Sequence, residues 1–379
     1  MLRSVALLAL VTTAEAYRFM AIGDWGASYT PPKTSTKDTC EIDPEVNCTT
    51  HGVSGCGYNE QQQMDGLQMG IHAAKSKVDH VMLLGDNFYG SGIHGDDTSC
   101  RFKKTFEDIY NASSLDIPFY AIAGNHDHGG NVSAQIAYTN DQKRWIYPDW
   151  YYGFEKSFTD AETNAEVTME FLMFDTVIAD SKDGRYGDTM TEDLIAAGKE
   201  PHSFLPADAP TAAEQWMWLE GKMKASTADY LWVGGHYPVW SGCSHGPDPI
   251  MNAKLKPLLE KYHASGYMCG HDHCQEHIDE GKGPVYVLSG SGFECCYPGT
   301  KASKVPKGAQ KMAYWLGDCP PGAVCPNKAT SLATGKAAFT VFDVSALRMT
   351  ITHIASDGEV LYEAPPLMPR KAEQKPGLW

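Results

Sequence analysis

The sequence has few basic residues for its size. Lysines and arginines number 31 against 47 aspartates and glutamates, which gives the 379-residue chain a net charge of −16. A nucleic-acid-binding surface needs stripes of Lys and Arg to neutralise phosphates, so this charge argues against that class of function. It does not argue against a small anionic substrate, because bound metal ions can reverse the potential locally.

Long hydrophobic runs are also missing. The apolar run Val5–Thr12 is too short to span a bilayer, and no later stretch is longer. Arg3 precedes this run and the small residues of Ala14-Glu15-Ala16 follow it, which predicts a secretory signal with Tyr17 as the first mature residue. The proline-rich, charged C-terminus does not resemble a lipid-anchor signal. We therefore expect a secreted or lysosomal/vacuolar protein.

The 11 cysteines all follow the predicted signal, so disulfides are expected, and the odd count leaves at least one thiol without an intrachain partner. Cys319 and Cys325 bracket a Pro-Pro-Gly turn and are placed to close a small loop. We expect the adjacent Cys295 and Cys296 to pair elsewhere rather than with each other, and leave the remaining connectivity open. N-glycan acceptor sequons, which support the same route, begin at Asn47, Asn111 and Asn131.

Hydrophobic patterns predict a β-α-β-α-β order in the first third of the chain. A helix is expected at Glu60–Lys75, with an apolar stripe formed by Met64, Leu67, Ile71 and Ala74. A second helix is expected near Arg101–Tyr110. The strands are expected at Arg18–Ile22, His80–Leu84 and Pro118–Ala123.

The rest of the chain predicts an antiparallel pair and a second series of strands and helices. Residues 28–58 form an insert without a regular period, and residues 180–210 form a long acidic loop. Helices are expected at Thr211–Lys224, with Trp216, Leu219 and Met223 on one face, and around Pro249–Tyr262. Strands are expected at Tyr151–Phe158, Val167–Phe174, Tyr230–Val233, Tyr267–Cys269 and Pro284–Ser289. We expect three C-terminal strands, Ala338–Val344, Met349–Ile354 and Val360–Glu363, to complete a second sheet. The fold class is therefore α/β, a single domain of two facing mixed β-sheets flanked by helices.

Seven side chains suited to metal binding follow the ends of five predicted strands. Any one of these Gly-flanked motifs alone is weak evidence, because a Gly-Asp pair is usually a turn. Together they provide carboxylates and an amide for hard cations, imidazoles for later divalent metals, and a phenol suited to ferric iron. Two metals about 3.5–4 Å apart can clamp a phosphate ester. The seven are Asp24, Asp86, Tyr89, Asn125, His236, His271 and His273.

These motifs resemble those of the calcineurin-like metallophosphoesterases. Most of that superfamily begins with Asp-x-His, but Gly26 stands at the His position here, and Tyr89 follows Asp86 by three residues. That exchange is typical of the purple acid phosphatases. Gly124-Asn125-His126-Asp127 and His236-Tyr237-Pro238-Val239-Trp240-Ser241 look most like the small, animal-type, tartrate-resistant form. The resemblance fails in the 28–58 insert and near residues 295–329.

The resemblance implies two adjacent metals. Asp24, Tyr89 and His273 would hold Fe(3+), and Asn125, His236 and His271 would hold a divalent ion, Fe(2+), Zn(2+) or Mn(2+), with Asp86 bridging both. It further implies that His126 and His245 bind phosphate and protonate the leaving group. Asp127 either orients His126 or caps a turn.

The expected function is therefore a secreted acid phosphatase that hydrolyses phosphate monoesters by attack of a metal-bound hydroxide. Its substrates would be small phosphate esters, phosphoproteins or nucleotides. The expected boundaries are a signal peptide at 1–16, a catalytic domain at 17–365 and a tail at 366–379. Three alternatives stay open: a nucleotide or diester phosphohydrolase with the same metals, a redox-active iron protein generating reactive oxygen species, and an inactive binding protein. We also expect the 180–210 loop to lie beside the metals and to restrain activity until it is cut.

Overall fold

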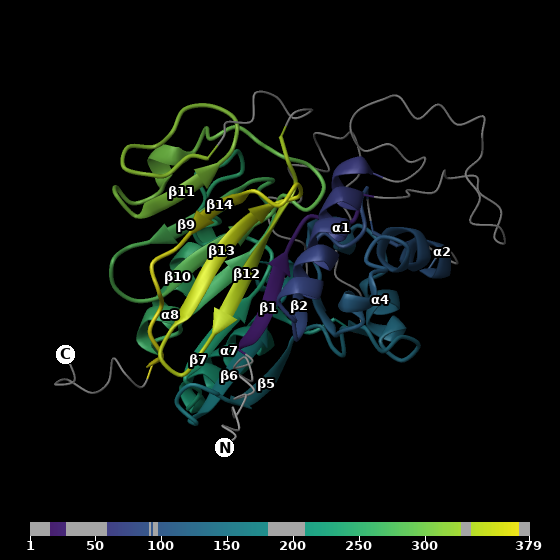
Figure 1. Cartoon of the computed structure of the whole chain (residues 1–379), viewed down its shortest axis with the longest axis horizontal. Coiled ribbons are helices and arrows are strands. Elements are labelled where there is room, and N and C mark those ends of the chain that lie inside the picture. The colour runs from purple at the N-terminus through teal and green to yellow at the C-terminus, as the bar shows by residue number, and fades with distance from the viewer. Residues whose placement is uncertain are drawn as a thin grey trace, which may run out of the picture.

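The computed structural model describes residues 16–27, 59–90, 92–93, 98–180, 209–326 and 335–370 (Figure 1). Nearly all of the predicted signal peptide, the 28–58 insert and residues 181–208 of the acidic loop lie outside these ranges. Within the described part of the chain, no helix is both long and apolar enough to cross a membrane.

The first of two seven-stranded sheets has the order β14-β13-β12-β1-β2-β3-β4. The pairs β1–β2, β2–β3 and β3–β4 are parallel, whereas β12 pairs antiparallel with β1 and is followed by β13 and β14 in antiparallel order. The strands span β1 Tyr17–Ile22, β2 His80–Leu84, β3 Phe119–Ile122, β4 Trp145–Ile146, β12 Ala338–Val344, β13 Met349–Ala355 and β14 Val360–Glu363.

The second sheet has the order β11-β9-β10-β8-β7-β6-β5. Its centre, β6-β7-β8-β10, is parallel, and its edges are antiparallel. The strands span β5 Tyr152–Thr159, β6 Glu166–Met173, β7 Tyr230–Gly234, β8 Gly266–Cys269, β9 Gln275–Asp279, β10 Val285–Ser289 and β11 Gln310–Tyr314.

The expectation that the three C-terminal strands build the second sheet is wrong, because they extend the first. In the structure β12 lies beside β1 (Figure 1). Phe342 is the partner of Phe19 in this pairing, and the two rings stack at 4.3 Å. The second sheet is completed instead by β9 and β11, which the hydrophobic pattern did not predict. The reason is that β9 has a polar sequence, although it is mostly buried.

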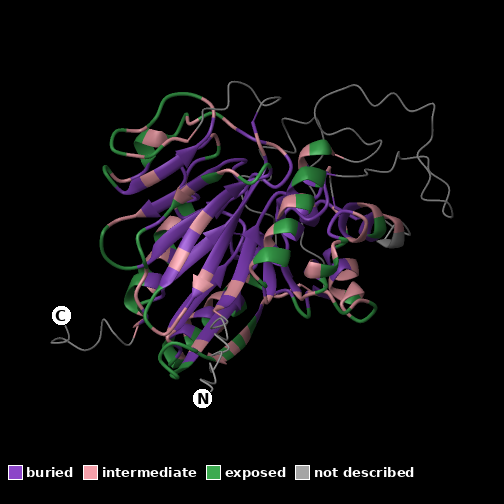
Figure 2. Ribbon diagram, in the orientation of Figure 1, coloured by how far each residue is buried: buried purple, intermediate pink, exposed green. Residues whose placement is uncertain are grey.

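The two sheets face each other across an aromatic core. Phe19 of β1 meets the edge of Phe171 of β6 at 5.1 Å, and Trp232 of β7 meets Phe342 of β12 at 5.2 Å. All four side chains have no exposed surface. Figure 2 shows the same division, with buried strands inside and exposed residues mainly on the helices and loops. The predicted single-domain architecture of two facing mixed sheets is confirmed.

The main helices lie at the predicted places, with changes at their ends. The helix expected at Arg101–Tyr110 begins three residues earlier, and both it and the helix expected near Pro249–Tyr262 contain a π-helical turn. The helical elements are α1 Glu60–Lys75, α2 Thr98–Phe102, the π-turn Lys103–Glu107, the 3₁₀ turn Ser113–Leu115, α3 Asn125–His128, α4 Val132–Tyr138, α5 Thr176–Asp180, α7 Ala212–Ala225, the π-turn Met251–Leu255, α8 Lys256–Lys261 and the 3₁₀ turn Ala302–Lys304.

The buried face of α1 differs from the prediction. Leu67 of the expected apolar stripe is 64% exposed, whereas Gly66 and Gly70 are buried. A Cβ atom on Gly66 would lie 2.8 Å from the carbonyl oxygen of Ile109, and one on Gly70 would lie 2.7 Å from the Cβ of Ala112. The helix therefore packs closely through its glycines, a contact that hydrophobic periodicity does not detect.

On α7, Leu219 and Met223 are buried as expected, while Trp216 is only partly buried and Gln215 takes the inner position.

The cysteines follow one expectation and contradict another. Cys319 and Cys325 are disulfide-bonded, as predicted. Cys295 and Cys296 are bonded to each other, so the expectation of separate partners is wrong. Both are fully buried, and the chain covers them closely: a Cβ on Gly335 would lie 2.1 Å from the carbonyl oxygen of Cys295. Free, buried thiols are found within the described ranges at Cys243, Cys269 and Cys274.

Candidate metal centre

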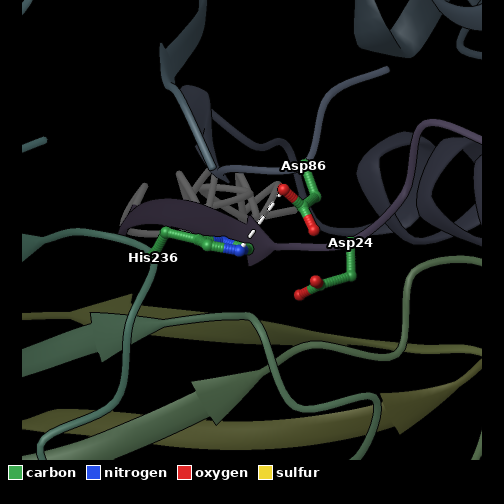
Figure 3. A group of neighbouring side chains, drawn as sticks. All are labelled: Asp24, Asp86 and His236. Atoms are coloured by element: carbon green, nitrogen blue, oxygen red, sulfur yellow. Dashed lines mark ion pairs between the residues drawn. The ribbon is translucent and has the colours of Figure 1, made fainter. Parts of the chain in front are cut away.

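The five predicted motifs meet where the carboxyl ends of the two sheets converge. Asp24, Asp86 and Asn125 follow β1, β2 and β3 of the first sheet, whereas His236 and His271 follow β7 and β8 of the second. Parallel strands end at the same edge of a sheet, which is why residues so far apart in sequence come together. Figure 3 shows Asp24 and Asp86 from the first sheet beside His236 from the second.

Two glycines leave the space into which the carboxylates project. A Cβ on Gly124 would lie 2.3 Å from Oδ1 of Asp86, and one on Gly270 would lie 2.3 Å from Oδ2 of Asp24. Both aspartates have a left-handed backbone, with φ of 56° for Asp24 and 52° for Asp86. This conformation is uncommon outside glycine, asparagine and aspartate, and it occurs often at functional sites. The shape of the site therefore depends both on the missing side chains at Gly124 and Gly270 and on the unusual backbone of the two aspartates.

One group of donor atoms surrounds the hydroxyl of Tyr89. This oxygen lies 3.0 Å from Oδ1 of Asp24, 3.0 Å from Oδ2 of Asp86 and 2.9 Å from Nε2 of His273. Nε2 of His273 is 3.6 Å from Oδ1 of Asp24. All four side chains are buried. The phenol, two carboxylates and one imidazole thus point at a single small volume.

A second group lies on the other side of Asp86. Oδ1 of Asn125 is 2.9 Å from Nε2 of His236 and 3.0 Å from Nδ1 of His271. Nε2 of His236 is also 3.4 Å from Oδ1 of Asp86, the contact drawn in Figure 3. Asp86 therefore presents Oδ2 to the Tyr89 group and Oδ1 to the Asn125 group.

The donors of the two sheets differ in kind. The first sheet supplies the oxygen donors Asp24, Asp86, Tyr89 and Asn125. The second sheet supplies nitrogen donors, from His236, His271 and His273.

The electrostatics of this set fit a bound cation. Burial raises the pKa of Asp24 well above its ordinary value, although His236 opposes the rise, and burial likewise raises the pKa of Tyr89. Burial also acts to raise the pKa of Asp86, but His236 and His126 outweigh it and hold that pKa below its usual range. Against the effect of burial, Asp86 raises the pKa of His236 to about 9. Three acidic groups crowded into one buried space require positive charge to ionise together, and bound metal cations would supply it.

Gly26 lies against the loop that carries Asp86 and Tyr89. A Cβ on Gly26 would lie 1.8 Å from the carbonyl oxygen of Asn87, so the present backbone admits no side chain there. Backbone hydrogen bonds from Gly26 to Asp86 at 3.3 Å and from Tyr89 to Gly26 at 2.9 Å hold the two loops together. Position 26 therefore offers no side-chain donor in this backbone, whereas Tyr89 on the adjoining loop offers one.

Asp127 joins two of the loops that carry these donors. Its carboxylate accepts hydrogen bonds from the backbone N–H groups of Asn87 at 3.0 Å, Phe88 at 3.1 Å and Gly124 at 2.8 Å, and from Nε2 of Gln135 at 2.9 Å. No hydrogen bond to His126 is found in the described structure, so the turn-capping alternative is correct. Asp127 fixes the loop after β2 against the loop after β3.

His126 and His245 lie at the edge of the site. The side chain of His126 is 37% exposed, and its Nε2 lies 3.9 Å from Oδ2 of Asp86. Its Nδ1 is 2.6 Å from the carbonyl oxygen of Gly90. The ring of His245 stacks on that of His271 at 4.3 Å. Both histidines thus adjoin the buried donors and remain partly open to a ligand.

Asp272 was not singled out from the sequence, although it stands between two predicted ligands. Its carboxylate accepts from the backbone N–H of His245 at 2.9 Å, from that of Gly246 at 3.1 Å and from the hydroxyl of Ser241 at 2.6 Å. It therefore holds the His245 loop against the loop of His271 and His273. Sequence patterns contain no signal for such a contact, because its partners lie far away along the chain.

Two further histidines, His128 and His277, are buried away from the donor groups, and others lie outside the described ranges. His128 is fully buried with Nε2 2.8 Å from Asp175, and His277 is buried in β9. His51 and His94 lie outside the described residues, as does the acidic segment 181–208 that we expected beside the metals.

Comparison with known proteins agrees with this geometry. A family model described as calcineurin-like phosphoesterase matches residues 17–275. The tartrate-resistant acid phosphatase type 5 of Rattus norvegicus is 33% identical over 352 residues, which cover 92% of this chain and 90% of that protein. Purple acid phosphatase 4 of Arabidopsis thaliana is 28% identical over 276 residues, 72% of this chain and 67% of that protein. Among solved structures, GAP50, the anchor in the inner membrane complex of Plasmodium, superimposes with a TM-score of 0.62 at 18% identity, over 93% of this chain and 89% of that one.

Proposed function

Since the chain belongs to the calcineurin-like phosphoesterase family and is a metal-dependent phosphatase, we propose that it is a secreted purple acid phosphatase. In this proposal it hydrolyses phosphate monoesters at acidic pH with a binuclear Fe(III)–M(II) centre, where M is Fe, Zn or Mn. The observation that supports the binuclear centre most directly is Asp86, whose two oxygens face two separate groups of donors.

The two groups of donors give the proposed assignment. Asp24, Tyr89 and His273 would hold the ferric ion, since a phenolate is a strong ligand mainly for Fe(III). Asn125, His236 and His271 would hold the divalent ion, and Asp86 would contribute one carboxylate oxygen to each site. When bound, the metal pair supplies Lewis acidity and lowers the pKa of coordinated water.

The chain's own residues position the substrate and move the proton. His126 and His245 approach the site from its open edge, so their ring nitrogens can bind phosphate oxygens and protonate the leaving group. Imidazole suits both tasks, because its charge changes near neutral pH. Asp272 accepts a 2.9 Å hydrogen bond from the backbone N–H of His245 and so fixes the backbone that carries this ring.

The proposal is tested by comparing wild-type protein with Asp86→Asn. Metal content is measured together with a pH profile on an aryl phosphate, and a panel of monoesters, diesters and nucleotides defines the substrate class. Asp141→Asn, at an exposed position, is the matched control for the loss of one carboxylate. We expect Asp86→Asn to lose both metals and its activity, while the control keeps both. Full activity and full metal content in Asp86→Asn would contradict the bridging role. A preference for diesters would support the alternative phosphohydrolase.

Secretion is tested separately by sequencing the N-terminus of protein recovered from the medium or from an acidic compartment. The proposal expects it to begin at Tyr17. Retention of residues 1–16 in the mature protein would contradict it.

A further inference from the structure

The segment Phe293–Tyr297, which follows β10, surrounds the ring of His273. The phenol ring of Tyr297 stacks on the imidazole of His273 with a centroid distance of 4.3 Å and an interplanar angle of 9°. Phe293 meets the edge of the same ring at 5.3 Å. The backbone N–H of Tyr297 also donates to the carbonyl oxygen of His273 at 2.8 Å. This segment therefore fixes both the ring and the backbone of one proposed iron ligand.

Glu294 of this segment contacts the remote nitrogen of His273. Its Oε2 lies 3.2 Å from Nδ1, while Nε2 of the same ring faces the hydroxyl of Tyr89 at 2.9 Å. The Glu294 side chain is 22% exposed and that of His273 is 5% exposed. The imidazole thus lies between the carboxylate on one side and the donor group on the other.

The other two proposed histidine ligands are supported differently. Nδ1 of His236 lies 2.8 Å from the carbonyl oxygen of Leu84, which is neutral, and His271 turns its Nδ1 toward Asn125 inside the site. Among the described residues, a carboxylate therefore contacts the ring nitrogen of His273 that faces away from the donor group. No such carboxylate contact is found for His236 or His271 in the described part of the chain.

We propose that Glu294 is a positioning residue for the ferric site, which it serves through His273. By accepting a hydrogen bond from Nδ1–H, it holds the tautomer that leaves the Nε2 lone pair for the metal. Its negative charge, passed through the imidazole, makes His273 a more basic ligand and favours Fe(III) over Fe(II). This inference rests on the proposed binuclear centre and adds to it a residue that selects the oxidation state of one metal.

Two substitutions separate the charge from the hydrogen bond. Glu294→Gln keeps an acceptor of the same size but removes the charge, whereas Glu294→Leu removes both. Glu166→Gln, exposed at the start of β6, is the matched control for the loss of one negative charge. The reduction potential of the Fe(III)/Fe(II) couple is measured by redox titration of the visible band. Iron affinity is measured by competition with a chelator, and the tautomer of His273 by ¹⁵N NMR of metal-free protein.

We expect Glu294→Gln to raise the reduction potential while Glu166→Gln leaves it unchanged. We expect Glu294→Leu to lower iron affinity by about 10–100-fold, the usual cost of removing the partner of a ligating histidine. In the metal-free protein, Glu294→Leu should give a mixture of His273 tautomers where wild type gives one.

Wild-type potential and iron affinity in both Glu294 variants would overturn the role of Glu294 and leave the binuclear centre standing. Wild-type protein that binds no iron would overturn the proposed centre, and the tautomer measurement would still decide whether Glu294 positions His273. An unchanged tautomer in Glu294→Leu would then contradict the positioning role as well.

Discussion

His277 should limit the stability of this protein in acid. It lies on β9, where its side chain is 3% exposed, and no hydrogen-bond partner for its Nδ1 is found in the described structure. Burial lowers its pKa from 6.5 to about 4, because the charged ring would lose its hydration; Asp279 opposes this shift and Lys311 adds to it. The rings that face it, His353 at 6.1 Å and Tyr362 at 5.6 Å, bring no negative charge.

The sign and size of the effect follow from the two pKa values. A folded-state pKa below the unfolded one means that folding favours neutral His277, so this contribution is fully present above pH 6.5. It is lost as the pH falls from 6.5 toward 4, because the unfolded chain takes up the proton first. A difference of about 2.5 pKa units at 1.36 kcal/mol each is about 3 kcal/mol of unfolding free energy.

The test is denaturant unfolding of wild type and His277→Gln at several pH values between 7.5 and 4. The glutamine does not titrate, so the variant should lose about 3 kcal/mol less than wild type over this range. His263→Asn serves as the control: it removes an exposed histidine, and asparagine accepts the φ of 52° found there. Parallel stability curves for wild type and His277→Gln would show that His277 is protonated or hydrated in the fold, and would refute the reasoning.

The remaining predictions concern the site. Tyr89→Phe should abolish the visible phenolate-to-iron band that would colour the oxidised protein, while circular dichroism shows an intact fold; an equally coloured variant would assign the band to another ligand. His126→Ala and His245→Ala should keep their metals and lower turnover by about 10²–10⁴-fold, more for alkyl than for nitrophenyl phosphates, because alkoxide leaving groups need a proton. Equal losses on both esters would make either histidine a phosphate binder. Asp272→Asn should weaken the hold on His245 and so also affect alkyl esters more; an equal fall on both would point to a general structural role. Gly26→Ala should lower the melting temperature, since its Cβ would lie 1.8 Å from a carbonyl oxygen, and an unchanged melting temperature would show that the loop can move.

Strand ends and ligand types were predictable because both are local properties of the sequence. Five of the donors, Asp24, Asp86, Asn125, His236 and His271, directly follow a glycine at the end of a short apolar run, so the pattern indicated them without any knowledge of their contacts. The structure brings all seven predicted donors together, while the metals they hold stay a prediction. Pairing between strands is not local, which is why β12 was expected in the wrong sheet.

Contacts made by polar or small residues were the hardest to predict. β9 is buried with a polar sequence, because Gln275 donates hydrogen bonds to Ser289 of the adjacent strand β10 and to the carbonyl oxygen of Ala338 in β12 of the facing sheet. The inner face of α1 includes Gly66 and Gly70 beside Met69 and Ala73, and the two glycines carry no hydrophobic signal. Asp272 contacts the His245 loop, which is distant in sequence, and Glu294 makes a single side-chain contact with His273. Neither contact produces a pattern that can be recognised in one sequence.

The division of oxygen donors and nitrogen donors between the two sheets has a mechanical consequence. Any cation coordinated by Asp86 and His236, or by Asp24 and His273, cross-links the two sheets of the domain. Because the folded state alone presents both halves of each donor group, cation binding adds to the free energy of unfolding as the ion concentration rises above its dissociation constant. Chelation would remove the cross-links between the two sheets at the site. The aromatic core around Phe19 and Trp232 would still hold the sheets together elsewhere. The concentration of free metal ions would therefore affect the stability of the folded domain as well as the occupancy of its site.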